Sequence, residues 1–417
     1  DDIVVNEYNP DSDTTTVAQS NPVVYDGTDS VQEPEPMVSG AIREPFVTLK
    51  GNNEDKVTIM LYMNGSDLES DNGMATMDIR EILSATISDN VRIIIQTGGT
   101  RRWKTEAIAS DRSQRFLVEN GALTLIDDSL GQLDVTDPDT LEDFITYCNT
   151  NYPANRNMLI FWNHGSGAVY GFGYDEHVDD YYAALTLDEI QTAIRNTGVK
   201  FEMIGFDACL MGGLETACAL SDSADYLIAS EDFESGRGWE YQNWLTVLGT
   251  NSSTPMEDLA KIIIDDFVKE SHSYGSDGIL ALIDLRYTRL LFQAWIDFAY
   301  SAKDDLLECN YSMEMNRTDR ASYRFGTPFE RILRDPWEAM FDNNESILEE
   351  YNYAVDLMAL ADTLDTEEAE ALEAALSMAL VYCSATHGDS EMTGLSITLP
   401  YNDSGFYEEM ETVYTNC

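Results

Sequence analysis

A histidine and a cysteine occupy corresponding places in two segments of the sequence, and together they could carry out nucleophilic catalysis. His164 follows the apolar run 158–162 and precedes Gly165, and Cys209 comes just after the apolar run 201–206. A free thiol with a pKa near ~8.5 is only a few per cent thiolate at neutral pH. A nearby imidazole can take the thiol proton during attack and return a proton to a departing amine. The pair therefore predicts acyl transfer, with Cys209 as the nucleophile and His164 as the general base.

The residues around this pair favour the same chemistry. The amides of Gly165 and Cys209 are natural donors to the oxyanion of a substrate carbonyl, because the glycines let the backbone approach closely. Cys209 also precedes a helix expected from Gly213, whose N-terminal dipole favours a thiolate. Taken singly, each residue is more often structural, since free cysteines are usually buried and lone histidines commonly just form hydrogen bonds. Their combination at two glycine-flanked strand ends favours catalysis.

Strand-like and helix-like segments alternate from Lys56 onward, and these elements must position the two residues. Short apolar, β-branched runs occur at 57–63, 91–96, 158–162, 201–206, 226–229 and 278–283. Stretches with helical spacing lie between them at 77–84, 139–148, 187–195, 213–220 and 257–270. This order predicts an α/β fold with a mostly parallel sheet and helices on both faces. Because ligands and catalytic groups gather beyond the carboxyl ends of such strands, His164 and Cys209 should lie close together.

Composition divides the chain into three predicted regions. Residues 1–45 are acidic and polar with a single basic residue, Arg43, which predicts a flexible leader. We interpret this leader as a tether in preference to a propeptide. A tether predicts a secreted or surface-anchored bacterial protein. Residues 46–285 form the predicted catalytic domain. Residues 286–417 form a predicted helical extension packed on it, with helical runs at 286–308, 345–362 and 367–382 and a strand-like segment at 395–400.

Charge and motif content exclude several classes of function. The chain has 76 Asp and Glu against 24 Lys and Arg, a formal charge of -52, which repels nucleic acids. No run reaches the roughly eighteen apolar residues of a membrane span. The six cysteines show no CxxC pair and the four histidines no HExxH, so no metal site is predicted. A calcium site is an alternative for an acidic loop, but that loop lacks the alternating ligands and glycine turn of calcium loops, which favours solvated carboxylates. Its residues are Asp175, Glu176, His177, Asp179 and Asp180.

Four blocks of the sequence resemble the motifs of the clostripain-like cysteine peptidases, which belong to the caspase-like clan. The blocks are Trp162-Asn163-His164-Gly165-Ser166-Gly167, Phe206-Asp207-Ala208-Cys209-Leu210-Met211, and the segments 61–69 and 229–239. Their order and spacing match the family from about residue 55 to 285. The resemblance implies a caspase-like three-layer sandwich and a His-Cys dyad with no obligatory third member. It also implies endopeptidase cleavage of peptides or proteins after Arg or Lys.

A preference for basic residues requires buried or focused negative charge in the first substrate pocket. The candidates are Asp207, two residues before the nucleophile, then Glu231 and Asp232, with Trp239 either lining the pocket or packing in the core. Arg237 in the same loop could neutralise such a pocket. A peptidase with a non-basic preference is therefore an alternative. A catalytically silent surface-binding protein on the same scaffold is another.

The segment between the two motifs bears on activation. Residues 165–194 contain neither Lys nor Arg, whereas several relatives are cut after a basic residue between their His and Cys motifs. We therefore predict that self-cleavage in this segment does not activate the protein. We further expect a monomer that requires no cofactor.

Overall fold

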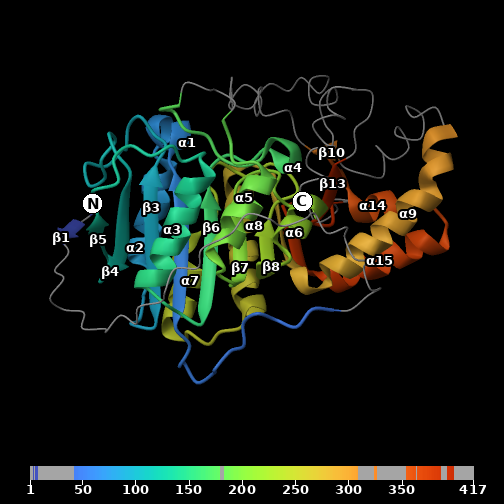
Figure 1. The fold of residues 1–417 in the computed structure, drawn as a ribbon, viewed down its shortest axis with the longest axis horizontal. Helices are drawn as coiled ribbons and strands as arrows, with labels where there is room; N and C mark the ends of the chain where they lie inside the picture. Colours follow the sequence, from blue (N-terminus) through green and yellow to red (C-terminus); the bar gives the residue numbers. More distant parts are fainter. Residues whose placement is uncertain are drawn as a thin grey trace, which may run out of the picture.

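The computed structural model describes residues 3, 5–7, 42–178, 183–308, 324–325, 354–362, 364–386 and 392–398. Within these residues one ten-stranded sheet has the order β1-β5-β4-β3-β2-β6-β7-β8-β9-β12 (Figure 1). Its strands are β1 (Val5–Glu7), β2 (Val57–Asn64), β3 (Val91–Gly98), β4 (Gln114–Glu119), β5 (Ala122–Asp127), β6 (Arg156–Trp162), β7 (Phe201–Asp207), β8 (Ala224–Ala229), β9 (Ile279–Asp284) and β12 (Leu380–Ala385). A second sheet contains β10 (Arg324–Phe325), β11 (Ala354–Asp356) and β13 (Ser396–Thr398).

Five central strands of the main sheet, β3, β2, β6, β7 and β8, are parallel. β4, β9 and β12 pair antiparallel with their inner neighbours, and β1 pairs parallel with β5. All six strands that the sequence predicted are present. The predicted α/β class with a mostly parallel sheet is confirmed.

Helices cover both faces of the sheet. One face carries α3 (Pro138–Asn151), α5 (Leu187–Thr197), α6 (Leu214–Leu220), α9 (Thr288–Glu308) and α15 (Glu367–Ala379), and the other carries α2 (Met74–Ser84), α7 (Tyr241–Thr250) and α8 (Met256–Tyr274). Alternate residues of β2 enter the two cores, because Met60 and Tyr62 pack with the first set of helices and Ile59 and Leu61 with the second. The short helices are α1 (Ser66–Asn72), α4 (Gly167–Tyr170) and α14 (Leu357–Ala361). None of the described helices is both long and apolar enough to span a bilayer.

The chain reverses its direction of travel across the sheet at β2. β3, the next strand along the chain, lies on one side of β2, whereas β6 lies on the other side. In open α/β sheets, the crevice between the carboxyl ends of two such strands is where ligands bind. The carboxyl ends of β2 and β6 therefore mark the expected position of a site.

The region after residue 285 departs from its prediction. The predicted helix 345–362 is wrong at residues 354–356, which form β11. The observed helix α14 begins at Leu357. Residues 345–353 lie outside the described residues. The predicted helix 367–382 ends at Ala379, because the chain then pairs as β12 with the edge strand β9. Figure 1 shows α9, α14 and α15 at this end of the sheet. The division at residue 285 stays a prediction.

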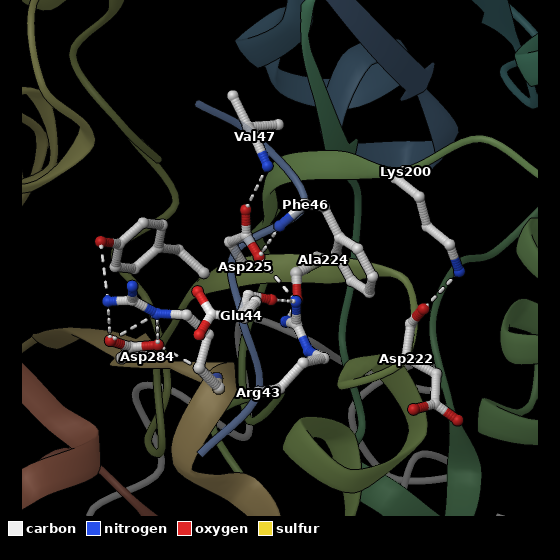
Figure 2. Close-up of polar contacts among 11 residues, drawn as sticks. Arg43, Glu44, Phe46, Val47, Lys200, Asp222, Ala224, Asp225 and Asp284 are labelled. Carbon is white, nitrogen blue, oxygen red and sulfur yellow. Dashed lines mark hydrogen bonds and ion pairs between the residues drawn. The ribbon is translucent and has the colours of Figure 1, made fainter. Parts of the chain in front are cut away.

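Asp225, at the amino end of β8, anchors the segment that leads into the domain (Figure 2). Arg43 Nη1 donates to Asp225 Oδ1 at 2.9 Å, and the amides of Phe46 and Val47 donate to the two carboxylate oxygens at 2.8 and 2.9 Å. The guanidinium also lies 3.7 Å from the centroid of the Phe46 ring. Because this is the amino end of a parallel strand, the segment enters at the edge opposite the predicted site.

Candidate active site

His164 follows β6 directly, and the preceding asparagine fixes its backbone. The Asn163 amide donates to Asp207 O at 3.4 Å, and its side-chain nitrogen donates to Asn64 O at the end of β2. Asn163 Oδ1 accepts from the His164 amide at 2.5 Å. The three strand ends are thus tied together, and His164 is 7% exposed.

The imidazole of His164 is held by Asp67, a residue to which the sequence analysis gave no role. Nε2 lies 2.8 Å from Asp67 Oδ1, in the first turn of α1. The preceding Ser66 has a φ of 45°, in the left-handed region that non-glycine residues rarely adopt. Burial alone would raise the pKa of Asp67, but the charge and hydrogen bond of His164 and the Ser66 hydroxyl together lower it. Because Nε2 is occupied, Nδ1 is the nitrogen left to face a thiol or a substrate.

Cys209 lies on the turn after β7. Its Sγ accepts from the Glu234 amide at 3.2 Å and donates to Glu234 O at 3.9 Å. The next residue, Leu210, has a φ of 65°, so this turn also contains a left-handed non-glycine residue. Burial raises the pKa of the thiol to about 12. The hydrogen bond from the Glu234 amide lowers this pKa, whereas the negative charges of Glu234 and Asp232 raise it. Burial is the largest cause of this shift, so the resting thiol keeps its proton.

The two turns are in direct contact. β6 and β7 are hydrogen-bonded neighbours with Trp162 opposite Asp207. A Cβ on Gly165 would lie 2.0 Å from Cys209 O, so only glycine fits between the turns. No hydrogen bond between described residues joins the imidazole to the thiol, because His164 is paired with Asp67 and the sulfur with Glu234. The catalytic roles of His164 and Cys209 stay a prediction.

Asp207 is buried beneath the loop that follows β8. Its Oδ1 accepts from the Trp239 amide at 3.2 Å, and its Oδ2 accepts from the Tyr241 hydroxyl at 2.8 Å. A Cβ on Gly238 would lie 2.6 Å from Oδ1, so the loop covers the carboxylate closely. Burial raises the pKa of Asp207 to about 7.

The other predicted pocket residues, Glu231, Asp232 and Trp239, differ in what their side chains contact. Glu231 points toward the C-terminal segment, where its Oε1 accepts from the Gly394 amide at 2.6 Å. Asp232 is half-buried, and burial raises its pKa to about 7. Trp239 is fully buried, and its ring packs on β7, where a Cβ on Gly205 would lie 2.5 Å from it. Of the four predicted pocket residues, Asp207 and Trp239 are brought together, whereas the carboxyl of Glu231 contacts another part of the chain.

Arg237 does not neutralise Asp207 in this structure. Its guanidinium lies 4.1 Å from the centroid of the Tyr274 ring, and its Nη1 lies 3.5 Å from Met77 Sδ. Among the described residues, no Lys or Arg forms an ion pair with Asp207.

Glu234 was not singled out by the sequence analysis, although it lies within the motif block 229–239. It is 5% exposed, and its carboxyl faces the Asp207 carboxyl, the Trp239 side chain and the Ala208 backbone. The carboxyl lies beside that of Asp207, and each influences the ionisation of the other. The available signal was a carboxylate in the loop that borders the nucleophile.

The described residues contain no group of three or more His, Cys, Asp or Glu side chains that could hold a metal ion. Glu176 accepts from Arg101 Nε at 2.8 Å and from the Ser70 hydroxyl at 3.0 Å, and Asp175 accepts hydrogen bonds from the backbone amides of Val135 and His177. Asp179 and Asp180, the other carboxylates of the predicted acidic loop, lie outside the described residues. The calcium alternative stays a prediction.

Comparisons with known proteins identify relatives of this chain. The model of the clostripain family matches residues 61–407. Clostripain of Hathewaya histolytica is 27% identical over 239 residues, which are 50% of this chain and 45% of that protein, so the chain matches less than half of that relative's length. An inactive zymogen C11 protease from Parabacteroides distasonis superposes with a TM-score of 0.63 at 18% identity, covering 87% of this chain and 98% of the other. A secreted C11 cysteine protease from Bacteroides thetaiotaomicron, solved with an irreversible peptide inhibitor, gives a TM-score of 0.59 at 15% identity, with 87% and 99% covered. These solved structures share the fold, which agrees with the predicted three-layer sandwich.

Proposed function

The chain belongs to the clostripain family of cysteine peptidases, and we propose that it is an endopeptidase in which Cys209 attacks the substrate carbonyl and His164 transfers the protons. One observation carries this proposal above the others. The glycine turn after β6 contacts the turn after β7, so the histidine and the cysteine share one edge of the sheet at its topological switch point.

The hydrogen bond between His164 and Asp67 supports different tasks for the two imidazole nitrogens. Asp67 holds Nε2 and orients the ring, so Nδ1 takes the thiol proton. Because burial raises the pKa of Cys209, proton transfer accompanies attack on the carbonyl and does not precede it. The amides of Gly165 and Cys209 donate to the oxyanion, the imidazolium then protonates the departing amine, and water hydrolyses the thioester. His164 and Cys209 thus form the reacting pair, and Asp67 orients the histidine.

We further propose that cleavage follows Arg or Lys. Asp207 and the loop over it place buried carboxyl groups beside the nucleophile, and the guanidinium of Arg237 is turned toward Tyr274. A buried guanidinium or ammonium requires such partners. The expected substrate is a peptide or protein, and the protein acts as a monomer. The similarity to a secreted relative and the acidic leader support a secreted or cell-surface location in a bacterium.

Paired variants test the proposal. Cys209→Ala and His164→Ala should abolish cleavage of fluorogenic peptides with Arg or Lys before the scissile bond. Cys218→Ala, on α6, and His272→Ala, exposed on α8, serve as matched controls and should cleave normally. An acyloxymethyl ketone carrying Lys should label Cys209 stoichiometrically, whereas iodoacetamide should react more slowly than with a model thiol because the resting thiol is protonated.

The outcomes separate this proposal from its rivals. Full activity of Cys209→Ala would refute it. A protein that cleaves no peptide and takes up no ketone label would instead be a silent binding protein. Cleavage only after apolar or acidic residues would retain the nucleophile and refute the basic preference.

A further inference from the structure

We infer that Glu176 is a positioning residue of the catalytic site: through Ser70 on α1 it sets the Asp67 carboxylate against the imidazole of His164. This inference rests on the proposed peptidase function and adds a residue that does not touch the substrate. Glu176 lies in the segment between the histidine and cysteine motifs, and the proposed mechanism gives it no part.

The carboxylate of Glu176 joins two elements near the histidine. Its Oε1 accepts from the Ser70 hydroxyl of α1 at 3.0 Å. Its Oε2 accepts from the Arg101 amide at 2.8 Å and from the Thr100 hydroxyl at 3.3 Å, both in the loop after β3. The Glu176 side chain is 2% exposed, so these bonds replace the water that the carboxylate has lost. A carboxylate buried in this way fixes the helix and the loop relative to each other.

The ion pair between Glu176 and Arg101 does not account for this burial. Arg101 Nε and Nη2 lie 2.8 and 2.6 Å from Glu176 Oε1, but the Arg101 side chain is 66% exposed. An ion pair with one partner in solvent contributes little to stability. The guanidinium therefore covers the carboxylate from outside, whereas Ser70 bonds it from α1. Loss of the guanidinium should matter less than loss of the Ser70 hydroxyl.

The direction of α1 depends on contacts outside the helix, because α1 is short and glycines flank both of its ends. Asp67 and Ser70 are three residues apart, which places them on the same side of the helix. Asp67 Oδ1 lies 2.8 Å from His164 Nε2, and Ser70 Oγ lies 3.0 Å from Glu176 Oε1. A rotation of α1 that breaks one of these bonds also disturbs the other. The bond to Glu176 therefore sets the direction of Asp67.

A second carboxylate of α1 anchors the helix elsewhere. Glu69 is fully buried, and it accepts from the Thr76 amide and hydroxyl and from the Lys104 amide. These bonds attach α1 to α2 and to the loop after β3, and they remain when Ser70 or Glu176 is replaced. The helix should then stay folded and attached, while the side that carries Asp67 is free to turn.

The segment that carries Glu176 also holds the backbone of His164. The Gly173 amide donates to His164 O at 3.0 Å. Three residues later, the Glu176 amide donates to Gly99 O at 3.1 Å, at the start of the loop after β3. One segment thus holds both partners of the hydrogen bond between His164 and Asp67. It holds the histidine through its backbone and α1 through the Glu176 carboxylate.

Replacing Ser70 with alanine tests the link with the smallest change. Alanine favours a helix, and Glu176 keeps its bonds to the loop after β3. Ser70→Ala should lower kcat about five- to tenfold with little change in KM, because α1 lies outside the proposed pocket. Glu176→Gln should lower kcat by about tenfold or more. Two controls, Ser84→Ala on α2 and Arg101→Gln, replace exposed side chains and should keep kcat within about twofold of wild type.

A double-mutant cycle with Asp67 separates positioning from general stability. If Glu176 acts only through Asp67, neither Ser70→Ala nor Glu176→Gln should lower kcat further in a protein that already carries Asp67→Ala. Losses that multiply in the double variants would overturn the inference, because Ser70 and Glu176 would then act through another part of the protein.

A spectroscopic measurement depends neither on cleavage nor on the folding of Glu176→Gln. In protein labelled at the histidine nitrogens, the proton between His164 Nε2 and Asp67 should give a signal far downfield, which is assigned by its loss in His164→Ala. The signal should move upfield or broaden by exchange with water in Ser70→Ala, and it should stay unchanged in Ser84→Ala.

The outcomes distinguish this inference from the proposed function. An unchanged proton signal in Ser70→Ala, with kcat within about twofold of wild type, would overturn the inference while cleavage itself persists. A wild-type protein that cleaves no peptide would count against the proposed function, and the proton signal would still decide whether Glu176 and Ser70 position Asp67.

Discussion

Replacing Asp67 with asparagine keeps the shape of the side chain and removes the charge that faces His164. Asp67 Oδ1 lies 2.8 Å from Nε2, which is the distance of a strong charge-assisted hydrogen bond. Such bonds contribute about 1.5 to 3 kcal/mol. At 1.36 kcal/mol for each factor of ten, kcat/KM should fall roughly 10- to 150-fold. Asparagine can still accept from Nε2, so Asp67→Asn should lie near the lower limit and Asp67→Ala near the upper.

The assay is kcat and KM for a peptide with Arg before the scissile bond, from about pH 5 to 9. The loss should appear in kcat with little change in KM, because Asp67 contacts the histidine and lies outside the proposed pocket. Asp71→Asn, an exposed residue on the same helix, is the matched control and should retain full activity.

The pKa of Asp67 also predicts an effect on stability. Because that pKa is lowered in the folded protein, the contribution of Asp67 is complete above its unfolded value and is lost as pH falls through the folded value. At neutral pH, Asp67→Asn should therefore unfold at lower denaturant concentration than wild type. If both Asp67 variants keep kcat within about twofold of wild type, less than 0.5 kcal/mol, the orienting role is refuted.

Two further predictions concern packing and pH. Gly165→Ala should reduce kcat/KM by about 100-fold or more, because the added Cβ would lie 2.0 Å from Cys209 O and force the two turns apart. The control Gly236→Ala should leave kcat/KM unchanged, because the space around Gly236 is open. Wild-type activity in Gly165→Ala would contradict the close contact. Burial raises the pKa values of several carboxyls, to about 7 for Asp207 and Asp232. A carboxyl whose pKa is raised on folding contributes stability at low pH, and this contribution is lost as pH rises through the pKa of the folded state. The urea midpoint should therefore be lower at about pH 8.5 than at about pH 5.5, and a higher midpoint at pH 8.5 would contradict the protonated cluster.

The central sheet was predictable because its strands are buried on both faces and appear as continuous apolar runs. The hairpin of β4 and β5 was missed, although its turn carries a strong local signal. Asn120 and Gly121 join the two strands and have φ values of 51° and 72°, as expected for an Asn-Gly hairpin turn. The strand β12 had no such signal, because its conformation depends on pairing with β9, which is about 100 residues earlier in the chain.

The site was predictable where it depends on strand ends and not where it depends on loop paths. His164 and Cys209 follow strands directly, so their shared edge follows from the parallel order of β6 and β7. Asp67 and Glu234 reach the site from a helix and a loop whose directions the sequence does not specify. Glu231 lies three residues from Glu234, yet its carboxyl contacts Gly394. Adjacent acidic residues of one loop therefore face different parts of the molecule.

The C-terminal segment 392–398 packs directly behind the nucleophile turn. The Ser396 amide donates to Gly212 O at 3.0 Å, and the Thr398 amide donates to Glu215 Oε1 at 2.9 Å. Leu210 forms a small apolar cluster with Cys209, Phe233, Ala354 and Met392.

These contacts determine how the turn that carries Cys209 is held. Leu210 has a left-handed backbone, and such a conformation persists only where surrounding contacts over-determine it. β7 holds the turn from one side through Asp207, and the loop after β8 holds it through the Leu210 amide, which donates to Asp232 O at 3.0 Å. The remaining support comes from residues beyond 285, through Ser396 on Gly212. The nucleophile turn is therefore held by residues on both sides of the predicted boundary at residue 285.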